Sequence, residues 1–476
     1  MGLFFTLLYI LTAYLGPTTV YGDLVEYRVQ LITCALAVLF SIPSMPGSGL
    51  FRIPQTFAVI GMCWAVLFSF VFNGLTSYAP AAFLDFLPSV FTFFLVVLNC
   101  KKKSHLQMII VVLVAASFFT IYQGFTALRA GDVMSPYLIG QGNDEGERIL
   151  RLRGLSFISD PNDFAQLLVS LIPLLFFFWN KGSGFKNMFF VVIPSAVLVF
   201  GMYLTHSRGA IVALLAVVAI SARRKIGTVP AAITAGVLFV GMTALNWAGG
   251  RGINAGAGAD RMAAWGTGLM LMRSHPFFGV GYERFTEFNE ITAHNSIVVT
   301  STELGFIGLF FWILFLLPTV REAVLTGYLS KKKKDDDADS ESLLQPAMAG
   351  ARVNPYAEMR TVRPQNKPAA PRAHAIATNP DLFDEEPQET LPPEEIQRLA
   401  TLMVICFTGY LVTSWFLSRS YVMTLFIYGG MTQVIFRAAQ RIGHAPQPLP
   451  TPRLLRLTLI TCIGLVALVY IILRIR

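Results

Sequence analysis

Long apolar runs recur along this chain, almost from its first residue to its last. A helix of about twenty apolar residues crosses the roughly 30 Å of hydrocarbon in a bilayer. The runs fall at about 3–20, 29–45, 55–74, 80–99, 106–124, 163–179, 188–205, 209–222, 229–247, 296–318, 399–417, 421–437 and 455–473, which gives about thirteen predicted spans. Because backbone polar groups inside lipid must be satisfied internally, we predict an all-α polytopic membrane protein with about 12–13 transmembrane helices.

The composition agrees with this fold class. Of the 476 residues, 54% are hydrophobic and 14% are charged, whereas about a quarter of the residues in a soluble domain are charged. This balance argues against a soluble enzyme, a disordered protein and a nucleic-acid binder. The first run lacks a basic segment and a cleavage site of small residues, so we expect a retained span rather than a signal peptide. The five cysteines show no ligand spacing, so no metal site or disulfide is expected.

Lysine placement predicts the orientation. Strict alternation of the spans puts every lysine on one side: Lys101, Lys102, Lys103, Lys181, Lys186, Lys225, Lys331, Lys332, Lys333, Lys334 and Lys367. The positive-inside rule makes this side the cytoplasm, with the N-terminus inside and the C-terminus outside. We therefore expect a multi-pass membrane protein with membrane lipids around it.

The opposite face has no lysine but many arginines, namely Arg28, Arg129, Arg148, Arg151, Arg153, Arg208, Arg251, Arg261, Arg273, Arg284 and Arg419. A guanidinium group binds phosphate or carboxylate with a two-pronged geometry that lysine lacks. This bias favours an external anion site. The alternative explanation for these arginines is codon bias together with pairing to nearby Asp and Glu.

The chain divides into five predicted segments. These are N-terminal transmembrane helices at 1–247, an external catalytic loop at 248–295, a transmembrane helix at 296–318, a disordered cytoplasmic insert at 319–396 and C-terminal transmembrane helices at 397–476. The insert is rich in Pro and Ala and has almost no aromatic residues, as is typical of disorder.

The external loop contains one predicted helix, at about 260–273. Arg261 and Trp265 are four residues apart and share a helical face. An amphipathic helix lying on the membrane surface has this pattern. Gly279 and Gly281 then allow a tight turn back toward the bilayer.

Arg208 and Arg261 are the leading candidates for binding an anion. Arg208 lies in a short external turn between two spans, where a charge is costly unless it has a partner. The next helix would add backbone donors there. The alternatives are a snorkelling interfacial arginine for Arg208 and a solvated surface charge for Arg261. Arg273 and Arg284 are weaker candidates of the same kind, because an acidic or terminal-turn neighbourhood is an alternative explanation for each.

His294 lies where the external loop returns to the membrane. Its imidazole titrates near neutral pH and can accept a proton from an attacking hydroxyl. A structural histidine at a helix boundary is the alternative. Glu303 follows inside the next span, and because a buried carboxylate is costly we expect it to pair with an arginine.

Five motifs follow one another in a recognisable order. They are Ser207-Arg208-Gly209-Ala210, Arg261 with Trp265, the segment from His275 to Gly281, His294-Asn295 and Glu303-Leu304-Gly305. In order, spacing and common external placement they resemble the O-antigen ligase and O-antigen polymerase superfamily of bacterial inner-membrane glycosyltransferases. The motif region covers about 154–318, roughly a third of the chain, in which each motif alone is weak.

The resemblance implies a GT-C-like helical fold and a transfer reaction at the periplasmic face. A glycan would move from undecaprenyl diphosphate to an acceptor hydroxyl on lipid A–core, a glycan or a protein, without metal, nucleotide or other cofactor. His294 resembles the base, and Arg208 and Arg261 resemble the ligands of the diphosphate. Arg153, Trp265, Arg284 and Glu303 complete the predicted substrate-binding set. The insert at 319–396 and the thirteenth span depart from the usual pattern of the family.

Three other functions stay open at this stage. A polymerase of repeat units and a protein O-oligosaccharyltransferase share the same site chemistry and differ in the acceptor, which the sequence does not identify. A transporter of lipid-linked or anionic solutes would need polar residues along several spans, whereas Asp85 is the clearest acid in the middle of a span.

Overall fold

The structure, a computed structural model of the full chain, describes all residues except 26, 143–145, 251–254, 349–389 and 476. The long helices are α1 (Gly2–Leu15), α3 (Val29–Ser41), α4 (Pro54–Val71), α5 (Ala79–Asn99), α6 (Lys103–Ala130), α7 (Pro161–Leu175), α9 (Ile193–Thr205), α10 (Arg208–Ile226), α11 (Thr228–Ala244), α12 (Ala255–Ser274), α14 (Gly305–Met348), α15 (Pro393–Ser414), α16 (Met423–Arg441) and α17 (Thr451–Arg474). Three shorter helices are α2 (Pro17–Val20), α8 (Gly184–Asn187) and α13 (Ser296–Glu303). Two strands, β1 (Leu138–Gly142) and β2 (Arg148–Leu152), form an antiparallel hairpin.

The predicted all-helical membrane class is confirmed. Within the described residues, nine helices are long and apolar enough to cross a membrane, and two apolar helices, Val29–Ser44 and Thr228–Ala244, are shorter. All thirteen predicted runs fall on helices, including the runs at 209–222 and 421–437, which form α10 and α16. The hairpin was not foreseen, because its five-residue strands alternate too briefly to stand out in an apolar chain.

Two helices lie at the centre of the bundle. From Met423 to Phe436 every residue of α16 is buried, and almost every residue of α7 is buried as well. A helix that is buried on all faces has no side left for solvent or lipid, so both helices belong to the interior of the bundle. By contrast, α17 exposes most of its apolar side chains, as a helix at the lipid-facing edge would.

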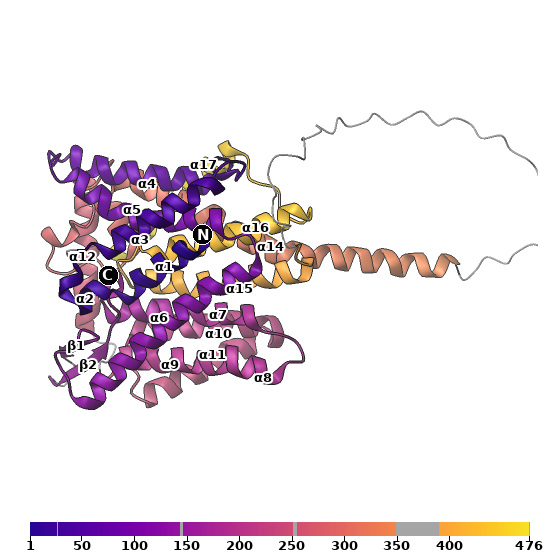
Figure 1. Cartoon of the computed structure of the whole chain (residues 1–476), viewed down its shortest axis with the longest axis horizontal. Coiled ribbons are helices and arrows are strands. Elements are labelled where there is room, and N and C mark those ends of the chain that lie inside the picture. The colour runs from indigo at the N-terminus through magenta and orange to yellow at the C-terminus, as the bar shows by residue number, and fades with distance from the viewer. Residues whose placement is uncertain (26, 143–145, 251–254, 349–389, 476) are drawn as a thin grey trace, which may run out of the picture.

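The two ends of the bundle differ (Figure 1). Helix α12 and the β1–β2 hairpin lie at one end, and α14 projects from the other. We call these the α12 end and the α14 end. The segments that carry the predicted site residues start or stop at the α12 end, and this arrangement brings together residues far apart in the sequence.

The predicted continuous span at 296–318 is wrong, because the helix breaks between α13 and α14. Gly305 there has a φ of 65°, and a Cβ atom added to it would lie 2.4 Å from the Phe277 backbone. The loop segment 276–281 enters at this break and binds its free backbone groups. Val280 N–H donates to Thr302 O at 2.9 Å, and Phe306 N–H donates to Pro276 O at 2.8 Å. The motif from His275 to Gly281 therefore has a structural role, since it closes a broken helix.

The predicted disorder of the insert does not hold at its start. Helix α14 continues to Met348, so residues 319–348 are helical. The sequence has neither Gly nor Pro between Gly327 and Pro346, so nothing in it ends the helix earlier. Residues 349–389 lie outside the described residues, and α15 begins at Pro393.

Candidate functional site

Arg208 is the first residue of α10, just after a tight turn. His206 ends α9 with a φ of 49°, and its Nδ1 donates to Trp247 O at 3.0 Å. Ser207 caps α10, because its hydroxyl accepts the Ala210 N–H at 3.3 Å. The turn thus fixes Arg208 at a helix N-terminus, where the exposed backbone donors favour an anion.

The start of α7 lies at the same end. Asp160 caps this helix, with its Oδ1 accepting the Asn162 N–H at 2.7 Å and Pro161 in the first turn. Asp163, also in the first turn, is buried and forms an ion pair with Arg419. Helix α7 therefore brings two carboxylates to the α12 end.

Arg261 is partly buried on α12, and within the described part of the chain it forms no ion pair. Burial lowers the pKa of Arg261, the positive charge of Arg208 lowers it further, and Asp160 acts in the opposite direction. The two guanidinium groups and the Asp160 carboxylate therefore act on one another. Two arginines that repel each other in a partly buried place are stabilised by an anion that binds both.

Trp265 follows Arg261 by one turn and fixes α12 in position. Its indole N–H donates to Ala293 O at 2.8 Å, directly before His294. Its ring packs edge-on against Trp415 at 5.8 Å between centroids, and the side chain is buried. This geometry favours a positioning role for Trp265 over the predicted contact with substrate.

His294 is held in a strained backbone conformation. Its φ is 46°, in the left-handed region that β-carbon-bearing residues seldom adopt and that often marks functional sites. Asn295 caps α13 by accepting the N–H groups of Ile297 and Val298 at 2.9 and 3.1 Å. The Asn295 amide also donates to Trp415 O at 3.2 Å. The strain is thus maintained by contacts on both sides of the histidine.

Burial and the neighbouring charges favour the neutral form of the His294 imidazole. Burial lowers the pKa of His294, the positive charge of Arg261 lowers it further, and Arg419 adds to this against the effect of Asp160. A neutral imidazole can accept a proton. The structure therefore brings together the predicted base and both predicted anion ligands.

Arg419 is a member of this cluster that the sequence did not single out. It lies in the connection between α15 and α16, which is pinned to α13. Ser296 Oγ donates to Leu417 O at 2.8 Å and accepts the Arg419 N–H at 3.1 Å. The Asp163 carboxylate raises the pKa of Arg419 against the opposing effect of burial. In the sequence Arg419 was one external arginine among eleven, and only its long-range pairing with Asp163 distinguishes it.

Arg153 and Arg284 have partners of their own. Arg153 Nε donates to Pro136 O at 2.9 Å. Arg284 forms an ion pair with Glu287, and the Arg284 Nε lies 2.9 Å from both carboxylate oxygens. The Arg284 Nη1 donates to Val280 O at 3.0 Å. These contacts favour a structural role for both arginines over the predicted role in substrate binding.

Glu303 does not pair with an arginine as we expected. It is buried at the end of α13, and its Oε1 accepts the Phe285 N–H at 3.4 Å. Among the residues that the structure describes, no cation forms an ion pair with it. The returning loop supplies a backbone donor instead. A role for Glu303 in substrate binding stays a prediction.

Comparisons with known proteins agree with the predicted superfamily. Residues 193–313 match the family model described as O-antigen ligase. This match runs from the start of α9 into α14 and contains Arg208, Arg261 and His294. Searches of curated proteins and of solved structures find no match to the chain.

Proposed function

We propose that this chain, whose residues 193–313 carry the O-antigen ligase family region, transfers a glycan from undecaprenyl diphosphate to an acceptor hydroxyl. The chain is a multi-pass membrane protein with ligase- or polymerase-type chemistry. We place the reaction at the periplasmic face of the bacterial inner membrane, because the α12 end carries arginines whereas α8 and α14, at the other end, carry lysines.

One observation carries the proposal. Three separate segments bring a neutral histidine and two mutually repelling arginines to one place within the family region. A transferase with a diphosphate leaving group needs a proton acceptor on one side of the anomeric carbon and positive charge on the other.

The proposed reaction is a substitution at the anomeric carbon of the glycan. The acceptor oxygen forms a bond to this carbon, and its proton passes to the imidazole of His294. The bond between the carbon and the diphosphate oxygen breaks, and the lipid diphosphate leaves as an anion. Arg208 and Arg261 bind the diphosphate oxygens and stabilise the charge that develops there.

An apolar groove beside the Arg208 turn suits the lipid tail. It measures about 340 Å³ and is lined by Ala196, Val199, Phe200, Tyr203, Leu245 and Trp247. Trp247 also holds His206 through its carbonyl, two residues before Arg208. A polyisoprenoid in this groove would therefore present its diphosphate at the α12 end.

A reconstituted assay tests the proposal. Purified protein receives undecaprenyl-diphosphate-linked glycan, with EDTA present, and either lipid A–core or no added acceptor. Glycan on lipid A–core identifies a ligase, and longer glycan on the lipid diphosphate identifies a polymerase. If neither forms and a Ser- or Thr-containing protein acceptor also stays unmodified, the transferase proposal fails.

A further inference from the structure

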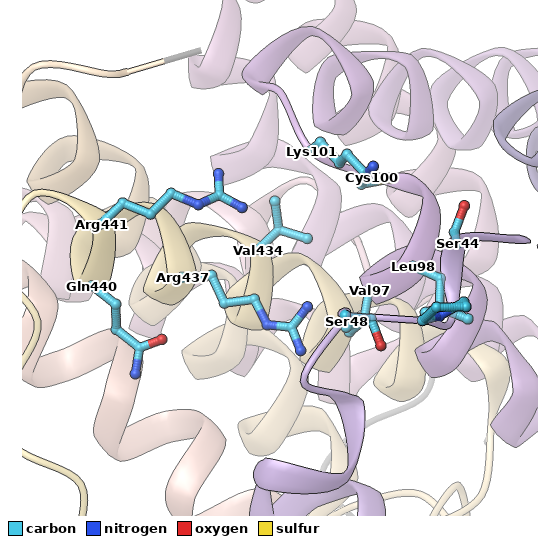
Figure 2. A pocket seen from close by; sticks show the side chains of 12 residues that line it. Ser44, Ser48, Val97, Leu98, Cys100, Lys101, Val434, Arg437, Gln440 and Arg441 are labelled. Carbon is cyan, nitrogen blue, oxygen red and sulfur yellow. The ribbon is translucent and has the colours of Figure 1, made fainter. Parts of the chain in front are cut away.

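A second cationic pocket lies away from the proposed active site (Figure 2). It encloses about 400 Å³ between the end of α16, the end of α5 with the residues that follow it, and the turn at 44–48. Its charged lining residues are Lys101, Arg437 and Arg441, and its neutral polar lining residues are Ser44, Ser48 and Gln440. Within the described residues, no acidic side chain lines it.

Helices α5 and α16 place this pocket at the far end of the bundle from His294. The two helices run side by side in the same direction. Phe86 lies 6.0 Å from Tyr421 between ring centroids near their starts, and a Cβ on Gly430 would meet Val96 further along. Helix α16 has 19 residues and so spans about 28 Å. Its start adjoins the connection that carries Arg419, and its end forms the pocket.

The cations of the pocket differ from their neighbours in lacking a carboxylate partner. Nearby, Glu395 pairs with Lys103 at 2.8 Å and with Arg398 at 2.6 Å. Within the described part of the chain, the side chains of Lys101, Arg437 and Arg441 form no hydrogen bond or ion pair. Arg437 and Arg441 are four residues apart on one helical face, where like charges destabilise each other.

The neutral polar lining residues add hydrogen-bond donors to the three cations. Figure 2 shows Arg437 and Arg441 extending from α16 across the pocket toward the side where Ser48 and Lys101 lie. The Ser48 oxygen accepts the Leu50 N–H at 3.3 Å, so its own proton is available to a ligand. Two guanidinium forks, an ammonium group, hydroxyls and an amide together match the oxygens of a phosphate group.

We propose that this pocket binds a phosphate group, carried by an anionic phospholipid headgroup or by a soluble phosphate. The ligand neutralises the repulsion between Arg437 and Arg441 and joins the ends of α5 and α16 to the turn at 44–48. The site is independent of the proposed transferase function, because none of its residues belongs to the His294 cluster.

Binding of defined ligands tests the proposal. The full chain in detergent is titrated with phosphatidylglycerol and, separately, with phosphatidylcholine, and bound lipid is counted by native mass spectrometry. The variant Arg437→Gln/Arg441→Gln should bind phosphatidylglycerol about tenfold more weakly or worse, since it loses several charge-assisted hydrogen bonds. The control Lys181→Gln/Lys186→Gln removes two charges outside the pocket and should bind as the unchanged chain does.

Pyrophosphate distinguishes a soluble ligand from a lipid. Because the proposed active site also binds diphosphate, this arm uses Arg261→Gln protein with and without the two pocket substitutions, and it measures the thermal shift. A shift that the pocket substitutions abolish supports a site for phosphate in general. If the pocket substitutions weaken phosphatidylglycerol binding but leave the pyrophosphate shift unchanged, the result supports a site for a lipid headgroup.

Unchanged binding of both ligands in Arg437→Gln/Arg441→Gln protein would overturn the proposal. It would also be overturned if phosphate bound only after deletion of 335–390, because the acidic insert would then be the natural occupant. Equal melting temperatures of the pocket variant and its control would show that any loss of binding is not a loss of folding.

Discussion

The hairpin segment (138–153) and the α12–α13 segment (255–303) both bring arginines to the α12 end, yet they hold them differently. In the hairpin, Arg151 is buried and satisfied on every side. It donates to Thr205 O at 2.8 Å, to Asn162 Oδ1 at 3.1 Å and to the Gln141 amide oxygen. In the second segment, the charges of Arg208 and Asp160 act on Arg261. Within the described residues, Arg261 forms no ion pair.

The role of an arginine at the α12 end therefore follows from its hydrogen-bond and ion-pair partners rather than from its position at that end. A satisfied arginine joins elements, as Arg151 joins β2 to α7 and α9. An arginine that retains unused donors beside a neutral histidine is available to a ligand. The predictions below test whether this distinction holds.

The largest expected effect is that of His294→Ala. If His294 is the base, transfer should fall by about 10²–10⁴-fold while the protein remains folded in the membrane. The matched control is His275→Ala, because within the described residues the side chain of that histidine hydrogen-bonds to Ser274 alone, at 3.0 Å. Equal activity of His294→Ala and unchanged protein would remove His294 as the base.

Arg261→Lys and Arg208→Lys should follow in size. A point charge does not reproduce the guanidinium fork, so we expect each to lower transfer by about 10²-fold, the scale for losing one donor to a developing anion. Arg284→Lys is the control, since Arg284 is already paired with Glu287. If both site variants keep full activity, bidentate binding of the diphosphate is excluded.

Asp163→Asn should mainly lower stability. It leaves the Arg419 charge without its buried partner, and breaking such a pair costs about 3–5 kcal/mol. Glu287→Gln, which breaks an exposed pair, should cost about 1 kcal/mol or less. Thermal unfolding in detergent measures both, and equal melting temperatures would contradict a structural role for the Asp163 pair.

The sequence predicts some of the features on which these outcomes depend, but not others. The spans and the candidate residues His294, Arg208 and Arg261 were predictable from the sequence, because apolar runs and short motifs are made of neighbouring residues. The break at Gly305, the hairpin and the Asp163–Arg419 pair were not, because each needs a partner from a distant segment. Local patterns in an apolar chain say little about which distant segments meet.

The pH profile should show a smaller effect. The base must be neutral, and it is neutral above its pKa. Since burial and Arg261 lower the pKa of His294 below its ordinary value of about 6.5, transfer should be retained at pH 6.5 and fall only below that. Arg261→Gln removes a positive charge, so its acidic limb should move to higher pH. An acidic limb at the same pH in both proteins would show that the charge of Arg261 does not affect the pKa of His294.

Deletion of residues 335–390 should have the smallest effect on transfer. Helix α14, which contains residues 335–348, projects from the bundle at the end opposite α12 (Figure 1). Purified protein without residues 335–390 should keep its rate within about twofold, because helix α14 leads into this segment at the end of the bundle opposite the His294 cluster. A large loss would show that the insert supports the fold of the bundle.

The most direct test of the central claim is the initial rate of glycan release from undecaprenyl diphosphate in purified, EDTA-treated protein. It is compared for the unchanged chain, Arg261→Lys and Arg153→Lys. The account predicts that Arg261→Lys is slower by about 10²-fold and that Arg153→Lys is close to the unchanged chain. Equal loss in the two variants, or none in either, would contradict the claim that Arg261, beside His294, holds the diphosphate.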